Sequence, residues 1–277
     1  MIRGNRRLII TGATGYIGRN LIPRLLKKGY KITILARDIE KKNIKWFKEV
    51  KLIKFNFNKV SINYDQLKKN YTLIHLAWEG LPNYYSSIHF KKNVKQHFVF
   101  IKKLIQKKIV KNLVVTGSCQ EYGMKLGLQK VNDETNPITS YGKAKVRLYK
   151  KLFGLKKKYN FNFQWLRLYY SYGKWQNKNS LFSQLDLSIK NNKKYFKMSK
   201  GDQKIDYLSI SKIIIKIVKA LENKKEGIFN VCSGKPIKLK DLVQKFIKIK
   251  KSKIKLKLGY YPYLNYEPKY FWGDNNL

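Results

Sequence analysis

The sequence of 277 residues contains little cysteine and no long apolar run. Its two cysteines, Cys119 and Cys232, are too few for a disulfide framework or a metal site, which favours a reducing cytoplasm. No apolar stretch reaches the roughly 18 residues of a membrane-spanning helix, so no membrane span is expected. The basic start leads into only Leu8 to Ile10 before a glycine turn, which is too short for a signal peptide.

Acidic residues are also scarce. Sixteen Asp and Glu face 61 Lys and Arg, which gives a formal net charge of +45. Such a charge can indicate a protein that binds nucleic acid or a membrane surface. However, the lysines are spread over every segment, only eight of the basic residues are arginine, and no DNA- or RNA-reading motif occurs. We therefore interpret the charge as a composition bias that also attracts anionic substrates such as nucleotide sugars.

The sequence does contain enough apolar residues for a core, at 43% of the chain. Apolar runs alternate with amphipathic stretches, and this order predicts an α/β fold with a doubly wound parallel sheet of the Rossmann type. The expected strands are Arg7–Thr11, Lys31–Leu35, Val50–Phe55, Leu73–Ala77, Asn112–Gly117 and Phe163–Leu168. The expected helices lie near Tyr16–Lys28, Ser86–Lys107 and Tyr141–Lys157.

After residue 170 the pattern loosens, and a small C-terminal substrate lobe interleaved with the sheet is expected. Helices are predicted at Ser180–Lys190, Ser209–Leu221 and Leu239–Lys248, a strand at Ile228–Val231, and an ordered loop from Tyr260 to Gly273. Residues 1–172 would form the cofactor-binding domain, with returning segments at about 205–231. Residues 173–204 and 232–277 would form the lobe.

The stretch from Leu8 to Gly18 predicts a dinucleotide site. An apolar strand ends in glycines at positions 12, 15 and 18, and an amphipathic helix follows. Glycines let backbone N–H groups approach a pyrophosphate, and the helix N-terminus adds positive dipole.

A tyrosine and a lysine are four residues apart in Tyr141-Gly-Lys-Ala-Lys145, at the start of an expected helix. Positions i and i+4 share one helix face. A nearby ammonium lowers the pKa of a tyrosine from about 10, which suits proton transfer to or from a hydroxyl or carbonyl. The spacing alone is not specific in a chain rich in both residues. Ser118, however, follows an expected strand at the sheet edge where open α/β folds place their sites.

Together, these three features resemble the extended short-chain dehydrogenase/reductase family, in its nucleotide-sugar epimerase/dehydratase/reductase branch. The resemblance covers nearly the whole chain, and the motifs follow in the family's order. The further matching segments are His75-Leu-Ala77, Asn93, Arg167 through Gly173 with Gln176, Gly201 through Tyr207, and Asn230 through Gly234.

The resemblance implies a role for each site residue. Tyr141 is the general acid/base, Lys145 lowers its pKa and binds the nicotinamide ribose, and Ser118 orients the sugar carbonyl or hydroxyl. The residues expected to bind the cofactor are Gly12, Thr14, Gly15, Tyr16, Ile17, Gly18, Arg37, Leu76, Ala77, Thr116, Tyr141 and Lys145. Those expected to bind a nucleoside-diphosphate sugar are Trp78, Ser118, Cys119, Gln120, Tyr141, Tyr170 and Lys204. No metal is expected, because His75, His89 and His97 are not spaced as ligands.

The end of the second expected strand bears on the choice of cofactor. A carboxylate there binds the ribose 2′-hydroxyl of NAD, whereas an arginine suits the 2′-phosphate of NADP. Ala36 occupies this position and Arg37 follows, which favours NADP. Asp38 lies close behind and leaves NAD open.

Departures from the family pattern narrow the reaction. The 4,6-dehydratases carry Asp-Glu directly after the catalytic Ser or Thr, where this chain has Cys119 and Gln120. The 3,5-epimerase/reductases place a cysteine where this chain has Gln120, so we interpret Cys119 as a small buried hydrophobe. Tyr170 replaces a common substrate-contacting Asn. Ile205 replaces an Arg that often reaches the diphosphate, and Lys204 would substitute for it as a point charge.

These features predict a reductase of a nucleoside-diphosphate 4-keto-6-deoxyhexose. Two alternatives stay open at this stage. One is a 4-epimerase with bound NAD, and the other is a family member that has become a nucleic-acid-binding or regulatory protein, although the intact Ser118, Tyr141 and Lys145 argue against the latter. The aromatic tail from Tyr260 to Pro268 either closes the sugar site or simply packs. A homodimer is also in keeping with the resemblance.

Overall fold

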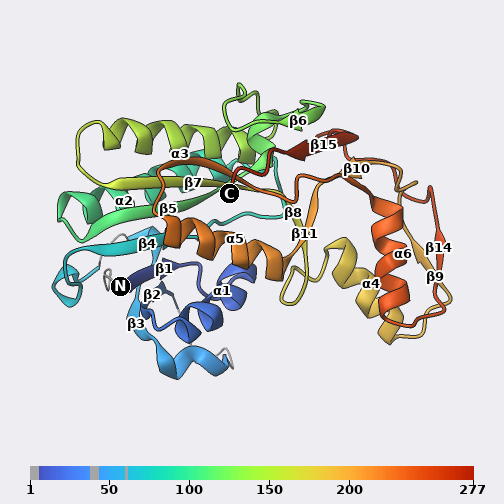
Figure 1. The fold of residues 1–277 in the computed structure, drawn as a ribbon, viewed down its shortest axis with the longest axis horizontal. Coiled ribbons are helices and arrows are strands. Elements are labelled where there is room, and N and C mark those ends of the chain that lie inside the picture. The colour runs from blue at the N-terminus through green and yellow to red at the C-terminus, as the bar shows by residue number, and fades with distance from the viewer. Residues whose placement is uncertain (1–5, 38–43, 60–61) are drawn as a thin grey trace.

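A computed structural model of the chain describes residues 6–37, 44–59 and 62–277 and is organised around one parallel sheet (Figure 1). The seven strands lie in the order β12-β7-β5-β4-β1-β2-β3, and every neighbouring pair is parallel. Their bounds are β1 (Arg7–Thr11), β2 (Lys31–Ala36), β3 (Lys51–Lys54), β4 (Tyr71–His75), β5 (Val110–Ser118), β7 (Asn162–Leu168) and β12 (Gly227–Val231). The predicted doubly wound sheet is therefore confirmed.

The strand order fixes where a ligand site can form. The chain runs outward from β1 to β3, then returns to β4 on the other side of β1 and continues outward to β12. The two halves separate at the carboxyl ends of β1 and β4, the switch point at which open α/β sheets bind ligands. All five residues of β4 are buried, as expected for a strand covered by helices on both faces.

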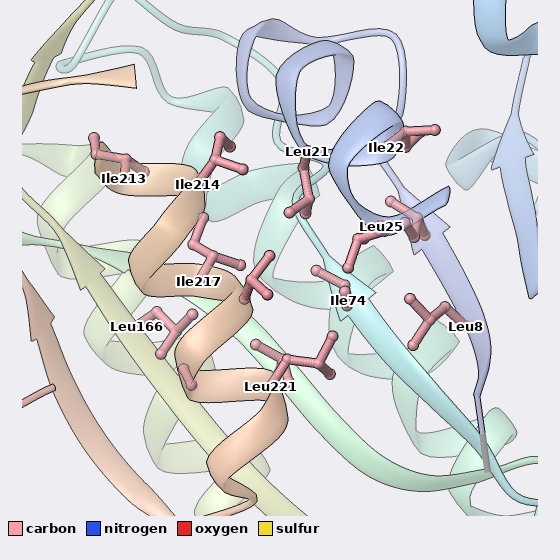
Figure 2. Close-up of a cluster of buried hydrophobic side chains, with 14 of the residues drawn as sticks. Leu8, Leu21, Ile22, Leu25, Ile74, Leu166, Ile213, Ile214, Ile217 and Leu221 are labelled. Carbon is pink, nitrogen blue, oxygen red and sulfur yellow. The ribbon is translucent and has the colours of Figure 1, made fainter. Parts of the chain in front are cut away.

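Helices cover both faces of the sheet (Figure 1). On one face, α1 (Tyr16–Lys27) and α5 (Ile210–Asn223) bury a cluster that includes Leu21, Leu25 and Ile217, shown in Figure 2. On the other, α2 (Val94–Gln106) and α3 (Ser140–Lys156) pack over a second cluster. The helix predicted from Ser86 instead begins with a π-helical turn over His89–Asn93, a distortion that often occurs at functional sites.

The C-terminal part forms a smaller unit beside the carboxyl ends of the sheet. Its helices α4 (Leu181–Lys190) and α6 (Leu239–Ile249) enclose their own apolar cluster with the paired strands β9 (Tyr195–Lys197) and β14 (Lys255–Lys257). A four-stranded sheet connects this unit to the large sheet and comprises β6 (Gly127–Gln129), β10 (Lys204–Ile205), β13 (Ile237–Lys238) and β15 (Tyr270–Gly273). Two further strands, β8 (Tyr170–Tyr172) and β11 (Tyr207–Ser209), pair with each other.

The prediction that the tail is loop as far as Gly273 is wrong at its end. Tyr270–Gly273 form β15, which pairs with both β10 and β6. The pairing partners are remote in sequence, so no local signal indicated a strand. Among the described residues, no helix is long and apolar enough to cross a membrane, and no group of acids, histidines and cysteines is arranged to hold a metal.

Candidate active site

The glycine turn joins the end of β1 to α1 at the switch point. Gly12 has a φ of +70°, and a Cβ at this position would lie 2.7 Å from the Ala77 nitrogen, so only glycine fits. A Cβ on Gly18 would lie 2.4 Å from the Gly12 carbonyl oxygen. Gly15 caps α1 without a side-chain hydrogen bond, which leaves the first helical N–H groups facing outward. This geometry fits the pyrophosphate of a dinucleotide.

The other predicted cofactor residues lie at the neighbouring strand ends. Leu76 and Ala77 follow β4 directly, and their nitrogens donate to the backbone and side chain of Thr11, at 3.3 and 3.4 Å. Thr116 lies in β5, and its hydroxyl donates to the His75 carbonyl at 3.3 Å. The carboxyl ends of three adjacent strands thus bring the predicted cofactor residues together.

The three predicted catalytic residues also converge. Ser118 ends β5, while Tyr141 and Lys145 lie one turn apart in α3. Thr139 caps α3 by accepting a bond from the Gly142 nitrogen at 3.0 Å, and this fixes the first turn that carries Tyr141. Ser118 lies close enough to Tyr141 for hydrogen bonding to its hydroxyl to lower the tyrosine's pKa.

Burial dominates the electrostatics of Tyr141. Its side chain is 8% exposed, and burial raises its pKa well above 10, while the bond to Ser118 lowers it. The role expected of Lys145 in lowering this pKa stays a prediction. The Lys145 ammonium donates to the Thr116 carbonyl at 2.8 Å, and it lies 3.9 Å from the centre of the Trp78 ring and 5.6 Å from that of Tyr141.

Burial of Lys145 should make protein stability depend on pH. Burial lowers its pKa from 10.5 to about 7, so between these values the unfolded chain holds a proton that the folded protein lacks. The unfolding free energy should therefore rise with pH across this window, by at most about 1.4 kcal/mol per pH unit from this group. Urea titrations of the cofactor-free protein and of Lys145→Met should differ in this slope. Parallel pH profiles for the two proteins would contradict the expectation.

Trp78 is held in place by two of the chain's histidines. Its indole stacks on His97 at 5.1 Å and donates to His89 Nδ1 at 3.1 Å, while His89 Nε2 bonds the Asn83 carbonyl at 2.8 Å. His75 connects His97 to Thr11 through bonds of 2.8 and 2.9 Å. Burial lowers the pKa values of all three histidines, so the rings are uncharged and hold Trp78 through stacking and hydrogen bonds.

A buried carboxylate lies beneath Ser118. Glu121 accepts a bond from the Ser118 nitrogen at 2.8 Å and from the Trp165 indole, and it forms a 2.8 Å ion pair with Arg167. Arg167 and Glu121 are 3% and 0% exposed. The pair therefore fixes the turn that presents the Ser118 hydroxyl.

The predicted substrate residues divide into two groups. Gln120 donates to the Tyr170 hydroxyl at 3.1 Å, and the Gln120 nitrogen bonds the Ser118 hydroxyl at 3.2 Å. Cys119 is 5% exposed, and burial raises the pKa of its thiol. Lys204 lies apart from this group: it is exposed, with its ammonium 5.8 Å from the centre of the Tyr270 ring.

The sequence does not identify Tyr84, and it leaves open whether the tail from Tyr260 to Pro268 closes the site. Tyr84 packs on Tyr141 at 5.5 Å and on Tyr266 at 5.2 Å, so the tail does reach the site. The neighbouring Glu267 accepts a bond from the Tyr170 hydroxyl at 2.6 Å. An acid in an otherwise aromatic tail was the one available signal for this residue.

The cofactor-discriminating position is only partly described. Ala36 ends β2, and the Arg37 guanidinium, which is 66% exposed, forms a 3.1 Å ion pair with Glu79. Glu79 also pairs with Lys92 at 2.7 Å. Asp38 lies outside the described residues.

Comparison with known proteins agrees with this geometry. The sequence model of the NAD dependent epimerase/dehydratase family matches residues 8–232. The chain is also 32% identical to the dTDP-6-deoxy-L-talose 4-dehydrogenase (NAD(+)) of Aggregatibacter actinomycetemcomitans, over 96% of this chain and 98% of the relative.

Solved structures show the same fold. The UDP-N-acetylglucosamine 4-epimerase of Methanobrevibacter ruminantium, in complex with UDP-N-acetylmuramic acid, has a TM-score of 0.84 at 19% identity, over 98% of this chain and 89% of that one. A mutant UDP-glucuronic acid 4-epimerase of Bacillus cereus, in complex with a fluorinated UDP-glucuronic acid and NAD, has a TM-score of 0.81 at 20% identity, over 98% and 90%. With its glycine turn and its Ser118, Tyr141 and Lys145 at one sheet edge, the chain belongs to the NAD dependent epimerase/dehydratase family.

Proposed function

We propose that this protein transfers a hydride between a nicotinamide cofactor and C4 of a nucleotide-linked 6-deoxyhexose, and that it works as a reductase of the 4-keto sugar. The observation that carries the proposal is the convergence of Ser118, Tyr141 and Lys145 beside the glycine turn. The name of the 32% identical relative supports it, since oxidation of a C4 hydroxyl is 4-keto reduction run backwards.

The residues after Ser118 favour simple hydride transfer over dehydration or carbon epimerisation. Neither Cys119 nor Gln120 supplies a carboxylate for dehydration. Thiolates, not thiols, are the reactive form of cysteine, and burial keeps Cys119 a thiol. The Gln120 side chain instead donates to the Tyr170 hydroxyl, which fixes the position of Tyr170 beside the site.

In the proposed reduction, a bound nicotinamide dinucleotide supplies the hydride. The Ser118 hydroxyl orients the C4 oxygen, and Tyr141 delivers a proton to that oxygen as charge develops on it. The Lys145 ammonium is placed between Thr116 and Trp78, near enough to stabilise the tyrosine after it has lost its proton. Burial of Tyr141 and Ser118 removes competing water from this step.

We propose NAD as the cofactor. The preference for NADP depended on Ala36 and Arg37, whereas two of the three related enzymes named above carry NAD in their name or complex. Because Arg37 is already paired with Glu79, a 2′-phosphate would have to compete with a carboxylate for its guanidinium. The substrate lobe at 173–204 and 232–277, and a homodimer, stay predictions.

Substrate and cofactor assays test this function together. Mixing the protein with NADH and a dTDP-4-keto-6-deoxyhexose should consume nicotinamide absorbance, and dTDP-6-deoxy-L-talose with NAD should produce it. NADH should be favoured over NADPH by at least about tenfold in kcat/KM, the effect of roughly 1.4 kcal/mol of differential binding. No turnover of any nucleotide-linked 4-keto sugar would reject the proposal. Interconversion of UDP-sugars without added cofactor would select a 4-epimerase instead.

A further inference from the structure

Glu267 is an unusual acid for this chain. It lies in the tail, yet its Oε1 accepts the Tyr170 hydroxyl at 2.6 Å, and Tyr170 in turn accepts from Gln120, which follows Ser118 by two residues. Only 16 of the residues are acidic, against 61 that are basic. A carboxylate so close to the candidate site is therefore not a product of the composition bias.

The position of Glu267 is fixed from both sides. Tyr266, before it, packs on Tyr84, which packs on Tyr141. After it, Pro268 is buried, and the Lys269 carbonyl accepts a bond from the Lys204 nitrogen at 2.8 Å. The strand β15 begins directly afterwards, so the carboxylate is held by anchored backbone rather than by a free loop end.

The surroundings of Glu267 supply hydroxyls rather than cations. Within the described ranges 6–37, 44–59 and 62–277, no lysine or arginine forms an ion pair with it, and its Oε2 has no hydrogen bond. Its charge raises the pKa values of Tyr84, Tyr170, Tyr207 and Cys119. Burial raises the pKa of Glu267, and the bond from Tyr170 lowers it.

We infer that Glu267 is a specificity-determining residue that selects an uncharged, hydroxyl-bearing sugar and rejects a uronic acid. A carboxylate accepts bonds from sugar hydroxyls but repels a second carboxylate that no cation neutralises. This inference rests on the proposed function: if Ser118 and Tyr141 hold the C4 oxygen, C6 is only two bonds from C4, so a C6 carboxylate would lie close to these residues. Uronic acids are real competitors, because enzymes of this fold bind UDP-glucuronic acid.

The sharpest test compares two ligands that differ only at C6. UDP-glucose and UDP-glucuronic acid, or the corresponding dTDP-sugars, are titrated calorimetrically into the NAD-loaded protein. The wild type should bind the neutral sugar at least roughly tenfold more tightly, which corresponds to about 1.4 kcal/mol. Glu267→Gln should reduce this ratio at least severalfold, mainly by tightening binding of the glucuronic acid, because it removes the charge but keeps the shape.

Two further variants make the result decisive. Glu134→Gln removes the same charge from an exposed position and should leave the ratio unchanged. Glu267→Asp keeps the charge and should still reject the uronic acid, while binding the neutral sugar more weakly. A ratio that is equal in wild type, Glu267→Gln and Glu134→Gln overturns the inference. Failure of the wild type to bind either sugar also overturns the inference, whereas failure to turn over any nucleotide-linked 4-keto sugar rejects the proposed function on which it rests.

Discussion

Replacing Tyr141 by Phe is expected to lower kcat/KM for the nucleotide sugar by roughly 10²–10⁴-fold, the usual contribution of one positioned acid or base. The change removes only the hydroxyl, whose pKa is influenced by Ser118. The ring contacts with Trp78, Tyr84 and His89 are retained, so the fold and the cofactor site should be unaffected. Initial rates of nicotinamide absorbance change, measured at saturating cofactor, give the effect directly.

A matched control lies on the same helix. Tyr149→Phe removes a hydroxyl two turns further along α3, where the ring packs on Phe163 and Trp165 rather than on Ser118 or Tyr141, so kcat/KM should stay within about twofold. Cofactor affinity should be equal in both variants and the wild type. If Tyr141→Phe and Tyr149→Phe have the same activity, Tyr141 is not the proton-transferring group.

The parts of this site that could be predicted are those encoded locally. Strands such as β1 are recognised as continuous apolar runs. The spacing of Gly12 and Gly18 indicates the turn after β1, and a Cβ at either position would clash with backbone atoms. Tyr141 and Lys145 share a helix face because of their spacing alone. Ser118 follows from the rule that ligands bind at the carboxyl ends of parallel strands.

The parts that could not be predicted depend on contacts between distant segments. Tyr84 and Tyr266 come from segments 182 residues apart along the numbering, yet they pack at 5.2 Å. No sequence rule predicts the π-helical turn that begins at His89, whose ring contacts Trp78 and lies against Gly80. The effect of burial on the pKa of Tyr141 likewise required the tertiary structure.

Acidic residues show how this cationic chain uses its few negative charges. Asp206 is fully buried and accepts bonds from the Ser233 and Gly234 nitrogens at 2.7 and 2.8 Å, which connects two of the family-like segments. Glu121 supports Ser118, and Glu267 contacts Tyr170. Lysines, by contrast, are mostly exposed. These three acids thus fix geometry in and near the site, whereas others, such as Glu222, form surface ion pairs.

Glu121 should therefore be the acid whose loss costs the most stability. Glu121→Gln is expected to lower the free energy of unfolding by about 3–5 kcal/mol, because it leaves the buried Arg167 guanidinium without a counter-charge. Gln can still accept bonds from Trp165 and the Ser118 nitrogen, so the cost reports the charge rather than a cavity. Urea titrations with linear extrapolation measure this difference.

A surface pair provides the comparison. Glu222 forms a 2.7 Å ion pair with Lys28, but the two side chains are 41% and 40% exposed, so Glu222→Gln should cost no more than about 1 kcal/mol. Combining Glu121→Gln with Arg167→Met should cost less than the two single changes added together, because no unpaired buried charge remains. Equal losses for Glu121→Gln and Glu222→Gln would mean that the Arg167 charge reaches water. Ser118 would then owe its position to β5 and the Gln120 nitrogen rather than to this ion pair.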